Sequence, residues 1–223
     1  MIVVHHLNHS RSQRVLWLLE ELGLEYGMER YDRDPATMLA PPSLRKVHRL
    51  GKSPVIVDGS LTLAESGAII EYVLDRYGQG RLRPAPDTAQ RVRYLYWMHY
   101  AEGSVMPPLL LKLVFDRLPK GRMPFFVRPI ARAISERAMR SFIQPQLTLH
   151  LDHLEAELAN FEWFAGDAFT AADVQLSYPL EAAVARAGLD ASRPRLMAWL
   201  DRIRVRPAYQ RALQRGGPHG IPG

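Results

Sequence analysis

The spacing of apolar residues changes along the chain, and each change predicts a different element. An apolar run at residues 2–4 predicts a short strand. Apolar positions at helical spacing over 15–22 predict a helix that ends at Gly23. Residues 25–31 predict a second strand. The chain is therefore expected to begin with a strand, a helix and another strand.

The pattern that follows predicts a hairpin and a further helix. Two short apolar runs, at 55–57 and 61–63, flank the dipeptide Asp58-Gly59, which favours a hairpin turn. A helical turn is expected at 43–47, and helical spacing returns over 69–74. The first part of the chain thus reads as a small α/β unit with the order β-α-β-α-β-β-α.

A segment rich in Gly and Pro separates this α/β unit, residues 1–78, from a part with only helical patterns. We expect a linker at 79–87 and an all-helical unit over 88–223. Within the helical unit, Pro107-Pro108 predicts a bend or break, and the Gly- and Pro-rich segment 216–223 predicts a frayed end. Helical patterns are expected at 88–118, 123–158, 170–187, 194–203 and 207–214.

Thr170 and Asp173 match the pattern of a helix N-terminal capping box. In such a box the hydroxyl accepts from a backbone N–H of the first turn, and the acid three residues later reaches back to the cap residue. Phe169 and Val174 stand where a hydrophobic staple would form. We interpret Thr170 and Asp173 as structural residues that begin a buried helix.

Composition limits the class of protein. Of 223 residues, 47% are hydrophobic and 23% charged, which is ordinary for a soluble globular protein. No apolar run approaches the roughly 18 residues of a membrane span, and no signal-peptide layout begins the chain, so we expect a cytoplasmic protein. Cysteine is absent, which excludes disulfides and a protein thiol. His5, His6 and His9 lack the partners of a metal site, so no metal is expected.

Charge is uneven along the sequence. Residues 1–78 carry 9 Lys and Arg against 10 Asp and Glu, whereas residues 79–223 carry 20 against 13. A basic surface of this kind could bind nucleic acid, a membrane surface or anionic substrates, or it could be a solvated helix face. No zinc-finger spacing or RNA-binding motif is present, so we expect no nucleic acid. The basic excess peaks over 116–140, at Arg117, Lys120, Arg122, Arg128, Arg132, Arg137 and Arg140.

Two dipeptides suggest a site for a small peptide-like ligand with a carboxylate. Pro54 at the start of a strand leaves Ser53 extended, with its backbone groups free to pair. Glu65 and Ser66 stand at a helix N-terminus, where free N–H groups and the helix dipole favour an anion. The pattern Gly51-Lys52-Ser53 is similar to the end of a phosphate-binding loop, but the glycine that such a loop requires is missing.

In this order and at these spacings, the units and motifs resemble the soluble glutathione S-transferase family over essentially the whole chain. The run at 10–23 looks like the start of the first helix in bacterial and fungal members close to the theta and beta types. The resemblance implies a thioredoxin-like N-terminal domain and an all-α C-terminal domain. It also implies glutathione as co-substrate and a homodimer.

The resemblance assigns roles at the site residue by residue. Pro54 would follow a cis peptide bond, and the backbone of Ser53 would pair with the cysteinyl part of glutathione. The Glu65 carboxylate would meet the ammonium of the γ-glutamyl end, and the hydroxyl and N–H of Ser66 would meet its carboxylate. Glu102 is a further hypothetical contact of the ammonium, directly or across a dimer.

The glycyl end of glutathione is less well defined by the sequence. Lys52 or His48 would meet the glycyl carboxylate. The chain has His48-Arg49 where the family commonly has Asn-Pro. Both candidates for the glycyl contact therefore stay open.

Family members activate the thiol with a Tyr, Ser or Cys in the loop after the first strand. This chain has neither Tyr nor Cys between residues 2 and 25, and Ser10 occupies the Ser/Cys position. Its hydroxyl would donate to the thiolate, as a hydrogen-bond donor and not as a nucleophile. Asn8, His9 and Ser12 are rival donors in the same loop, and a plain helix N-cap is the structural alternative for Ser10.

The resemblance implies a glutathione transferase that attacks small hydrophobic electrophiles, with peroxidase activity as a possible addition. Tyr100, Met106 and Leu110 are the expected lining of the electrophile pocket, although such residues more often belong to the core. A non-catalytic binding or regulatory module of the same fold is the alternative. A glutathione-dependent dehalogenase or isomerase is a further one, since fold alone does not choose among these.

Overall fold

A four-stranded mixed sheet forms the centre of the N-terminal domain in this computed structural model, which describes residues 1–217. Its strand order is β2-β1-β3-β4. β1 (Ile2–Leu7) runs parallel to β2 (Tyr26–Tyr31), so the chain crosses over between them through α1 (Ser12–Glu21). β3 (Val55–Asp58) pairs antiparallel with β1 and forms the predicted hairpin with β4 (Leu61–Ala64). The predicted thioredoxin-like fold of this part is confirmed.

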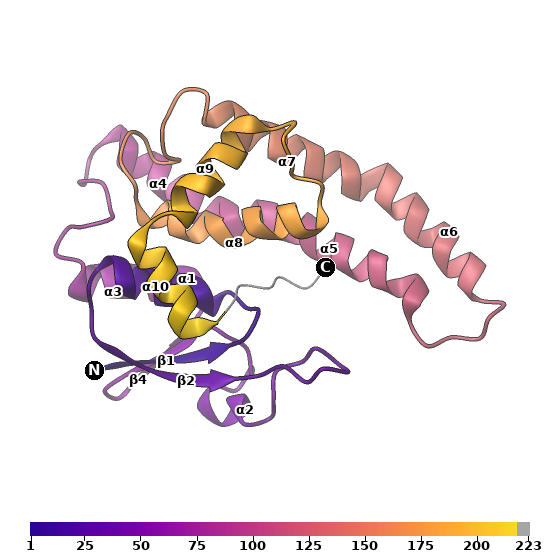
Figure 1. The fold of residues 1–223 in the computed structure, drawn as a ribbon, viewed down its shortest axis with the longest axis horizontal. Helices are drawn as coiled ribbons and strands as arrows, with labels where there is room; N and C mark the ends of the chain where they lie inside the picture. The colour runs from indigo at the N-terminus through magenta and orange to yellow at the C-terminus, as the bar shows by residue number, and fades with distance from the viewer. Residues whose placement is uncertain (218–223) are drawn as a thin grey trace.

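Helices cover the sheet on both sides. α1 and α3 (Ser66–Tyr77) lie on the side that faces the rest of the molecule, and the short α2 (Leu44–Val47) lies on the other side (Figure 1). Every residue of α1 from Ser12 to Leu19 is buried. The helix is enclosed because α8 and α10 pack against it from outside the sheet. Polar side chains on α1 are therefore taken out of water together with its apolar ones.

The C-terminal domain is all-helical. Two π-helical turns, Ala101–Val105 and Met139–Ile143, and one 3-10 turn, Leu118–Lys120, connect its α-helices. Among residues 1–217, no helix is both long enough and apolar enough to cross a membrane. The α-helices are α4 (Ala89–Tyr100), α5 (Met106–Arg117), α6 (Arg128–Ala138), α7 (Gln144–Glu157), α8 (Ala171–Arg186), α9 (Pro194–Arg204) and α10 (Pro207–Gly216).

Prolines mark where the long helical stretches change. Pro107-Pro108 predicted a bend or break, and the chain instead stays helical through the π turn that precedes α5. Pro145 follows the second π turn in the same way, at the start of α7. Each proline thus directly follows a wide π turn inside a continuous helix, where the altered hydrogen-bond pattern accommodates a residue without an N–H. The helix predicted from 123 begins only at Arg128, again with a proline in its first turn.

The predicted capping box at the start of α8 is confirmed. Thr170 accepts from the N–H of Ala172, and Asp173 accepts from the N–H of Thr170. The carboxylate of Asp173 also accepts from the N–H of Phe164 and from the indole N–H of Trp199. It therefore ties the helix start to two other segments of the C-terminal domain.

The last described helix, α10, returns to the N-terminal domain and packs on α1. Gly216, predicted to lie in a frayed end, is instead helical and buried. A Cβ on this residue would lie 2.5 Å from Oε1 of Gln13 and 2.7 Å from Cδ1 of Leu16, so only glycine fits so close to α1. Gly217 follows the helix, and the rest of that predicted frayed end, 218–223, lies outside the described residues.

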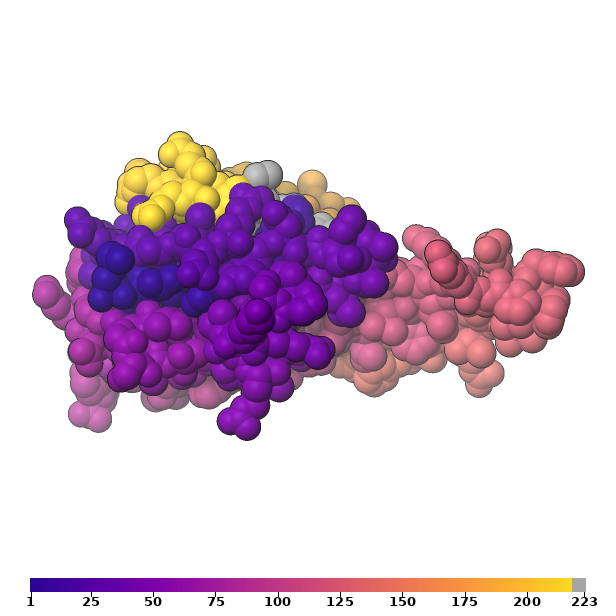
Figure 2. Space-filling model, turned by 90° about the horizontal axis from the view of Figure 1, so that it is seen from below, coloured from indigo at the N-terminus to yellow at the C-terminus, as the bar shows by residue number. Residues whose placement is uncertain are grey.

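The outer ends of α5 and α6 project from the body of the molecule as a helical hairpin. We call residues 110–134, which include the connecting loop, the arm. In both views the arm extends well beyond the remaining helices (Figures 1 and 2). The arm contains most of the basic segment that the sequence singled out.

Candidate active site

Ser10 and Ser53 meet at the carboxyl end of β1. Ser10 is buried, and its Oγ lies 3.4 Å from the Oγ of Ser53. The Ser53 hydroxyl donates to the backbone carbonyl of His5 at 3.0 Å, which anchors it to β1. The Ser53–Pro54 bond is cis, as the resemblance implies. The structure thus brings together two parts of the predicted site that are 43 residues apart in sequence.

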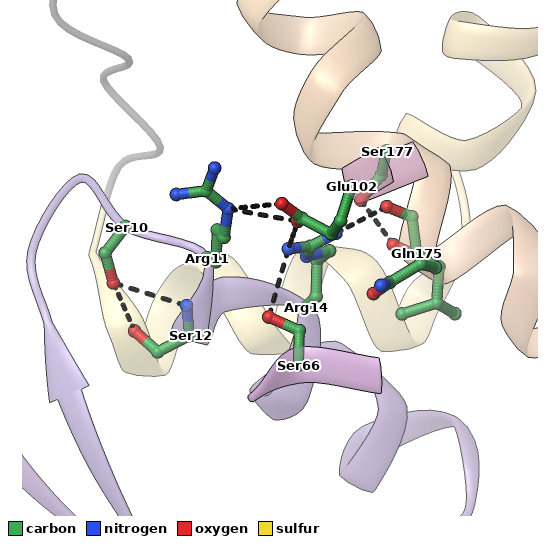
Figure 3. Close-up of polar contacts among 9 residues, drawn as sticks. Ser10, Arg11, Ser12, Arg14, Ser66, Glu102, Gln175 and Ser177 are labelled. Atoms are coloured by element: carbon green, nitrogen blue, oxygen red, sulfur yellow. Dashed lines mark hydrogen bonds and ion pairs between the residues drawn. The ribbon is translucent and has the colours of Figure 1, made fainter. Parts of the chain in front are cut away.

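A chain of short hydrogen bonds runs inward from Ser10. The Oγ atoms of Ser10 and Ser12 are 2.8 Å apart (Figure 3). The Oγ of Ser12 lies 2.9 Å from Nδ1 of His6, and Nε2 of His6 lies 2.9 Å from the carbonyl oxygen of Gly216. All four residues are buried. The loop after β1 is therefore connected, through β1 itself, to the backbone of α10.

The directions of these hydrogen bonds follow from the chemistry of the groups. A carbonyl only accepts, so Nε2 of His6 carries a hydrogen; in a neutral imidazole, Nδ1 is then an acceptor. Nδ1 takes the hydrogen of Ser12, so a hydrogen bond between the two hydroxyls needs Ser10 as its donor. The other acceptor for the Ser10 hydrogen is the Oγ of Ser53, at 3.4 Å. In a protonated imidazole Nδ1 donates instead, and both hydroxyls can donate outward. The direction in which the Ser10 hydrogen points is thus linked to the proton of His6.

Ser66, at the start of α3, accepts a hydrogen bond from the side chain of a buried arginine, Arg14 (Figure 3). Nη2 of Arg14 donates to the Ser66 hydroxyl at 3.1 Å and to Oε1 of Glu102 at 2.5 Å. Nη1 of Arg14 donates to the backbone carbonyl of Gln175 at 2.6 Å. The side chain of Arg14 is 1% exposed. One guanidinium therefore joins the start of α3 to both α8 and the π turn after α4.

Two arginines share the Glu102 carboxylate. Nε of Arg11 lies 3.0 Å from Oε1, the atom that also accepts from Arg14. Burial alone would raise the pKa of Glu102, but the charges of Arg14 and Arg11 outweigh it, so the pKa lies below its ordinary value. Both guanidinium groups also lie beside the ring of Tyr178, at 5.1 and 5.5 Å from its centroid. Contact of Glu102 with glutathione stays a prediction.

The remaining predicted glutathione ligands lie at the surface. Glu65 has φ 74° and ψ 121°, a conformation that non-glycine residues rarely adopt and that clusters at functional sites. Glu65 and Lys52 are exposed, and neither forms an ion pair within residues 1–217. Their charges are therefore accessible to a ligand. His48 is half-buried and ends α2, and its role at the glycyl end stays a prediction.

The three predicted pocket residues lie in different environments. The Tyr100 hydroxyl is 2.5 Å from Nδ1 of His150, and Met106 is buried beside the π turn. Leu110 is exposed at the base of the arm. A cavity of about 760 Å³ lies at the connection of α3 to α4, lined by residues that include Glu71 and Arg83. None of the three predicted residues lines this cavity, so their role stays a prediction.

The sequence did not single out the half-buried Arg11 or the buried polar residues Arg14, His6 and Gln175. One signal was available. Five consecutive apolar residues, 15–19, indicate a helix buried on all sides, and a charged residue directly before such a run is buried with it. Arg14 stands in that place. The partners of Arg14 come from 52 to 161 residues away, and no local pattern indicates them. Within residues 1–217, no group of His, Cys, Asp and Glu could hold a metal ion.

Comparison with known proteins agrees with this architecture in both domains. Residues 1–75 match the family described as "Glutathione S-transferase, N-terminal domain", and residues 135–202 match "Glutathione S-transferase, C-terminal domain". The chain is 37% identical over 215 residues to Glutathione S-transferase 3 of Schizosaccharomyces pombe, covering 96% of this chain and 88% of the relative. It is 32% identical over 217 residues to Glutathione S-transferase 1 of Saccharomyces cerevisiae, with 94% and 92% covered.

Solved structures agree as well. A glutathione S-transferase from Actinobacillus pleuropneumoniae superposes with a TM-score of 0.83 at 35% identity, covering 99% of this chain and 94% of that one. The sheet, the cis bond and the all-helical second domain define a two-domain, thioredoxin-like class of enzyme. Within that class, the chain belongs to the glutathione S-transferase family. It is an enzyme of the transferase type, as the sequence predicted.

Proposed function

We propose that the chain conjugates glutathione to small hydrophobic electrophiles through a glutathione thiolate formed at Ser10. The observation that supports this most directly is that Ser10 meets Ser53 of the cis Ser53–Pro54 bond, while Arg14 of α1 holds Ser66 at the start of α3. In this proposal, glutathione lies extended beside Ser53 and places its cysteinyl sulfur at Ser10. Its γ-glutamyl carboxylate takes the hydroxyl and N–H of Ser66.

The two ends of glutathione meet opposite charges in this proposal. The γ-glutamyl ammonium binds the exposed Glu65 carboxylate, and the glycyl carboxylate binds Lys52 or His48. Arg14, behind Ser66, keeps the Ser66 hydroxyl in place, because its guanidinium donates to that oxygen. The Ser66 hydrogen is then free to point at the ligand. A peptide with a carboxylate at both ends therefore matches the charges of the site.

Ser10 acts in this mechanism by stabilising the thiolate. A free thiol has a pKa of about 8.5, and lowering it by two units needs about 2.7 kcal/mol of preferential stabilisation. A hydrogen bond to a charged group contributes about 1.5–3 kcal/mol, and the N-terminus of α1 adds about 0.3–1 kcal/mol. These two contributions together reach the required value. The thiolate then attacks a soft electrophile or, as a secondary activity, a peroxide.

His6 takes part through the hydroxyl chain. Ser10 accepts from the backbone N–H of Ser12 at 3.2 Å and has one hydrogen to give to the sulfur. When the hydroxyl chain also supports that hydrogen bond, Ser12 donates to Ser10 and Nδ1 of His6 donates to Ser12. We therefore propose that the S–H proton passes along the two hydroxyls to Nδ1 of His6 as the thiolate forms. The S–H bond breaks, an N–H bond forms, and each serine gives up one proton and receives another. The thiolate is thus paired with an imidazolium two hydroxyls away.

The test is the ionisation of bound glutathione and the rate of conjugation in the native enzyme, Ser10→Ala and Ser12→Ala. Ser10→Ala should raise the pKa of the bound thiol by one to two units, read from thiolate absorbance, and slow conjugation of chlorodinitrobenzene about 10- to 100-fold at neutral pH. Ser12→Ala keeps the Ser10 donor but interrupts the path to His6. Glutathione binding should therefore release more protons to the buffer in Ser12→Ala than in the native enzyme.

Two outcomes count against these assignments. Full activity of Ser10→Ala would remove Ser10 from the mechanism and favour Asn8, His9 or Ser12. Equal proton release in the native enzyme and Ser12→Ala would remove His6. Glutathione binding without any turnover would instead favour a binding module. An assay with cumene hydroperoxide measures peroxidase activity, and an assay with haloalkanes measures dehalogenase activity.

We further propose a cytoplasmic homodimer. Three exposed apolar side chains on α4 could be buried against a second copy of the chain: Val92, Leu95 and Tyr96. Light scattering on the purified enzyme measures the mass of the particle directly. A mass of one chain at micromolar concentration would contradict the dimer.

A further inference from the structure

The tip of the arm exposes two aromatic rings to solvent. Phe125 is 84% exposed and Phe126 is 65% exposed. Their rings contact each other edge to face, with centroids 5.6 Å apart, and neither belongs to the hydrophobic core. Exposed apolar groups of this size usually mark a site of interaction. The tip is also the part of the molecule farthest from its body in both views (Figures 1 and 2).

Aliphatic side chains continue this apolar surface along both helices. On α6, Ile130 and Ile134 are exposed and stand one turn apart. Val114 on α5 and Leu118 in the 3-10 turn that follows it are also exposed. Ala131 and Ser135, each about 100° around α6 from the isoleucine before it, are buried and pack inward. The arm therefore exposes apolar side chains at its tip and on both sides of the tip along the chain; we call these six side chains its apolar surface.

Basic residues alternate with these apolar side chains along the sequence of the arm and just beyond it. Seven Lys and Arg stand over 116–140, against Asp116 and Glu136. Lys112 already pairs with Asp116 at 2.8 Å. Within residues 1–217, none of the seven basic side chains forms an ion pair with a carboxylate. An unpaired cationic surface around exposed aromatic rings matches a partner that is both apolar and anionic.

We propose that the arm docks the enzyme on the surface of an anionic lipid bilayer. Phe125 and Phe126 would enter the boundary between head groups and acyl chains, and the basic side chains around them would contact lipid phosphates. The projecting position lets the tip reach a flat surface before the body of the enzyme does. No helix needs to cross the bilayer, in agreement with the absence of a spanning helix from the described residues.

Two other occupants fit the arm less well. A second copy that bound through the same tip would bring one cationic surface against another, at an electrostatic cost. Nucleic acid would pair with the charges and stack on aromatic rings, but it offers nothing to the aliphatic side chains of Ile130, Ile134 and Leu118. A bilayer accommodates the charges, the rings and the aliphatic groups at once.

The experiment is flotation of the full-length enzyme with vesicles of phosphatidylcholine alone or mixed with phosphatidylserine. The native enzyme should float with the mixed vesicles only, and added salt should release it because the contacts are electrostatic in part. Phe125→Ala/Phe126→Ala should bind the mixed vesicles at least tenfold more weakly. Arg122→Glu/Arg128→Glu should lose binding as well.

Leu39→Ala/Val205→Ala is the matched control, because it also removes two exposed apolar side chains, but outside the arm. It should float as the native enzyme does. Equal flotation of the native enzyme and the Phe variant would overturn the proposal, as would equal binding to uncharged vesicles. If the native enzyme does not float and the Phe variant changes the mass of the particle, the arm binds a second copy. If the native enzyme does not float but binds single-stranded nucleic acid, and the Phe variant loses that binding, the arm binds nucleic acid.

The proposal is independent of the chemistry at Ser10. The Phe variant should conjugate glutathione in solution at the native rate, because neither ring contacts the site. Turnover without flotation would therefore reject only the docking, and flotation without turnover would reject only the proposed function.

Discussion

Asp173 accepts hydrogen bonds from three separate parts of the C-terminal domain while it is fully buried. Its donors are the N–H and hydroxyl of Thr170, the N–H of Phe164 and the indole N–H of Trp199, at 3.0 to 3.3 Å. Burial raises the pKa of this carboxyl to about 6, and the donors only partly offset it. Asp173, in the first turn of α8, therefore has a higher pKa in the folded protein than in the unfolded chain.

The raised pKa predicts a pH dependence of stability. The folded state holds the Asp173 proton more tightly than the unfolded state, whose pKa is about 3.9, so the native protein should lose stability as pH rises from about 4 to 6. The loss attributable to this group is about 3 kcal/mol. Asp173→Asn should lack this contribution to the slope.

Urea unfolding at several pH values, native protein against Asp173→Asn, isolates this contribution because the other carboxyls are common to both. Thr170→Ser keeps the capping hydroxyl and should follow the native slope. Parallel stability curves for the native protein and Asp173→Asn would show that the four donors fully offset burial.

At the residue scale, the sequence predicted what depends on local chemistry. Ser53, Pro54 and Ser66 could be singled out because strand starts and helix starts have local signals, and the capping box was found in the same way. Arg14 was missed because its partners come from three other elements. The hydroxyl chain from Ser10 to His6 was missed because its end, Gly216, is 210 residues away from His6 in sequence.

Helix α1 is the element through which the two domains are linked. Its Arg14 is charged, buried and shared between the start of α3 and Glu102 in the π turn after α4. Arg14 is 1% exposed, so removing Glu102 leaves the charge of Arg14 buried, which in a fully buried pair commonly costs about 3–5 kcal/mol. Glu102 is 35% exposed and keeps Arg11 as a partner when Arg14 is removed.

A double-mutant cycle at this pair measures the link. Glu102→Gln should destabilise the protein by about 3 kcal/mol, because Arg14 then keeps its charge in a buried place. Arg14→Met/Glu102→Gln should be less destabilised than the sum of the two single variants. The free energy of unfolding of all four proteins in urea gives the coupling, and additive effects would mean that the pair contributes no link. Arg76→Met, at an exposed arginine, is the control.

At the element scale, periodicity predicted most strands and helices, because one face or stripe of each is buried. The π turns were missed, since the apolar spacing through 88–118 does not differ between a continuous α-helix and one with a single wide turn. The start of α6 was predicted five residues early because the arm loop, around Phe125, is as apolar as a helix face. In that loop the apolar residues face solvent, which periodicity alone cannot indicate.

For the whole molecule, the proposed site predicts a large stabilisation by glutathione. A ligand at 100 times its Kd should add about 2.7 kcal/mol to the free energy of unfolding. A thermal shift with millimolar glutathione checks this, and Ser66→Ala should reduce the shift, because the γ-glutamyl carboxylate loses a donor. Gly-Gly-Gly at the same concentration is the ligand control, since it has no γ-glutamyl end. The absence of any shift in the native enzyme would count against the entire site.

The buried Gly216 has a consequence for how the enzyme is made. The sheet, α1 and the Ser10 loop leave the ribosome early, and their local contacts do not need the end of the chain. His6 gains its carbonyl partner only when residue 216 has been synthesised and α10 has docked on α1. A nascent or prematurely terminated chain would thus contain every predicted glutathione ligand and still lack the group that fixes the imidazole. Conjugation activity in a translation extract would therefore report chains synthesised through α10, whereas antibodies against the sheet would also count unfinished ones.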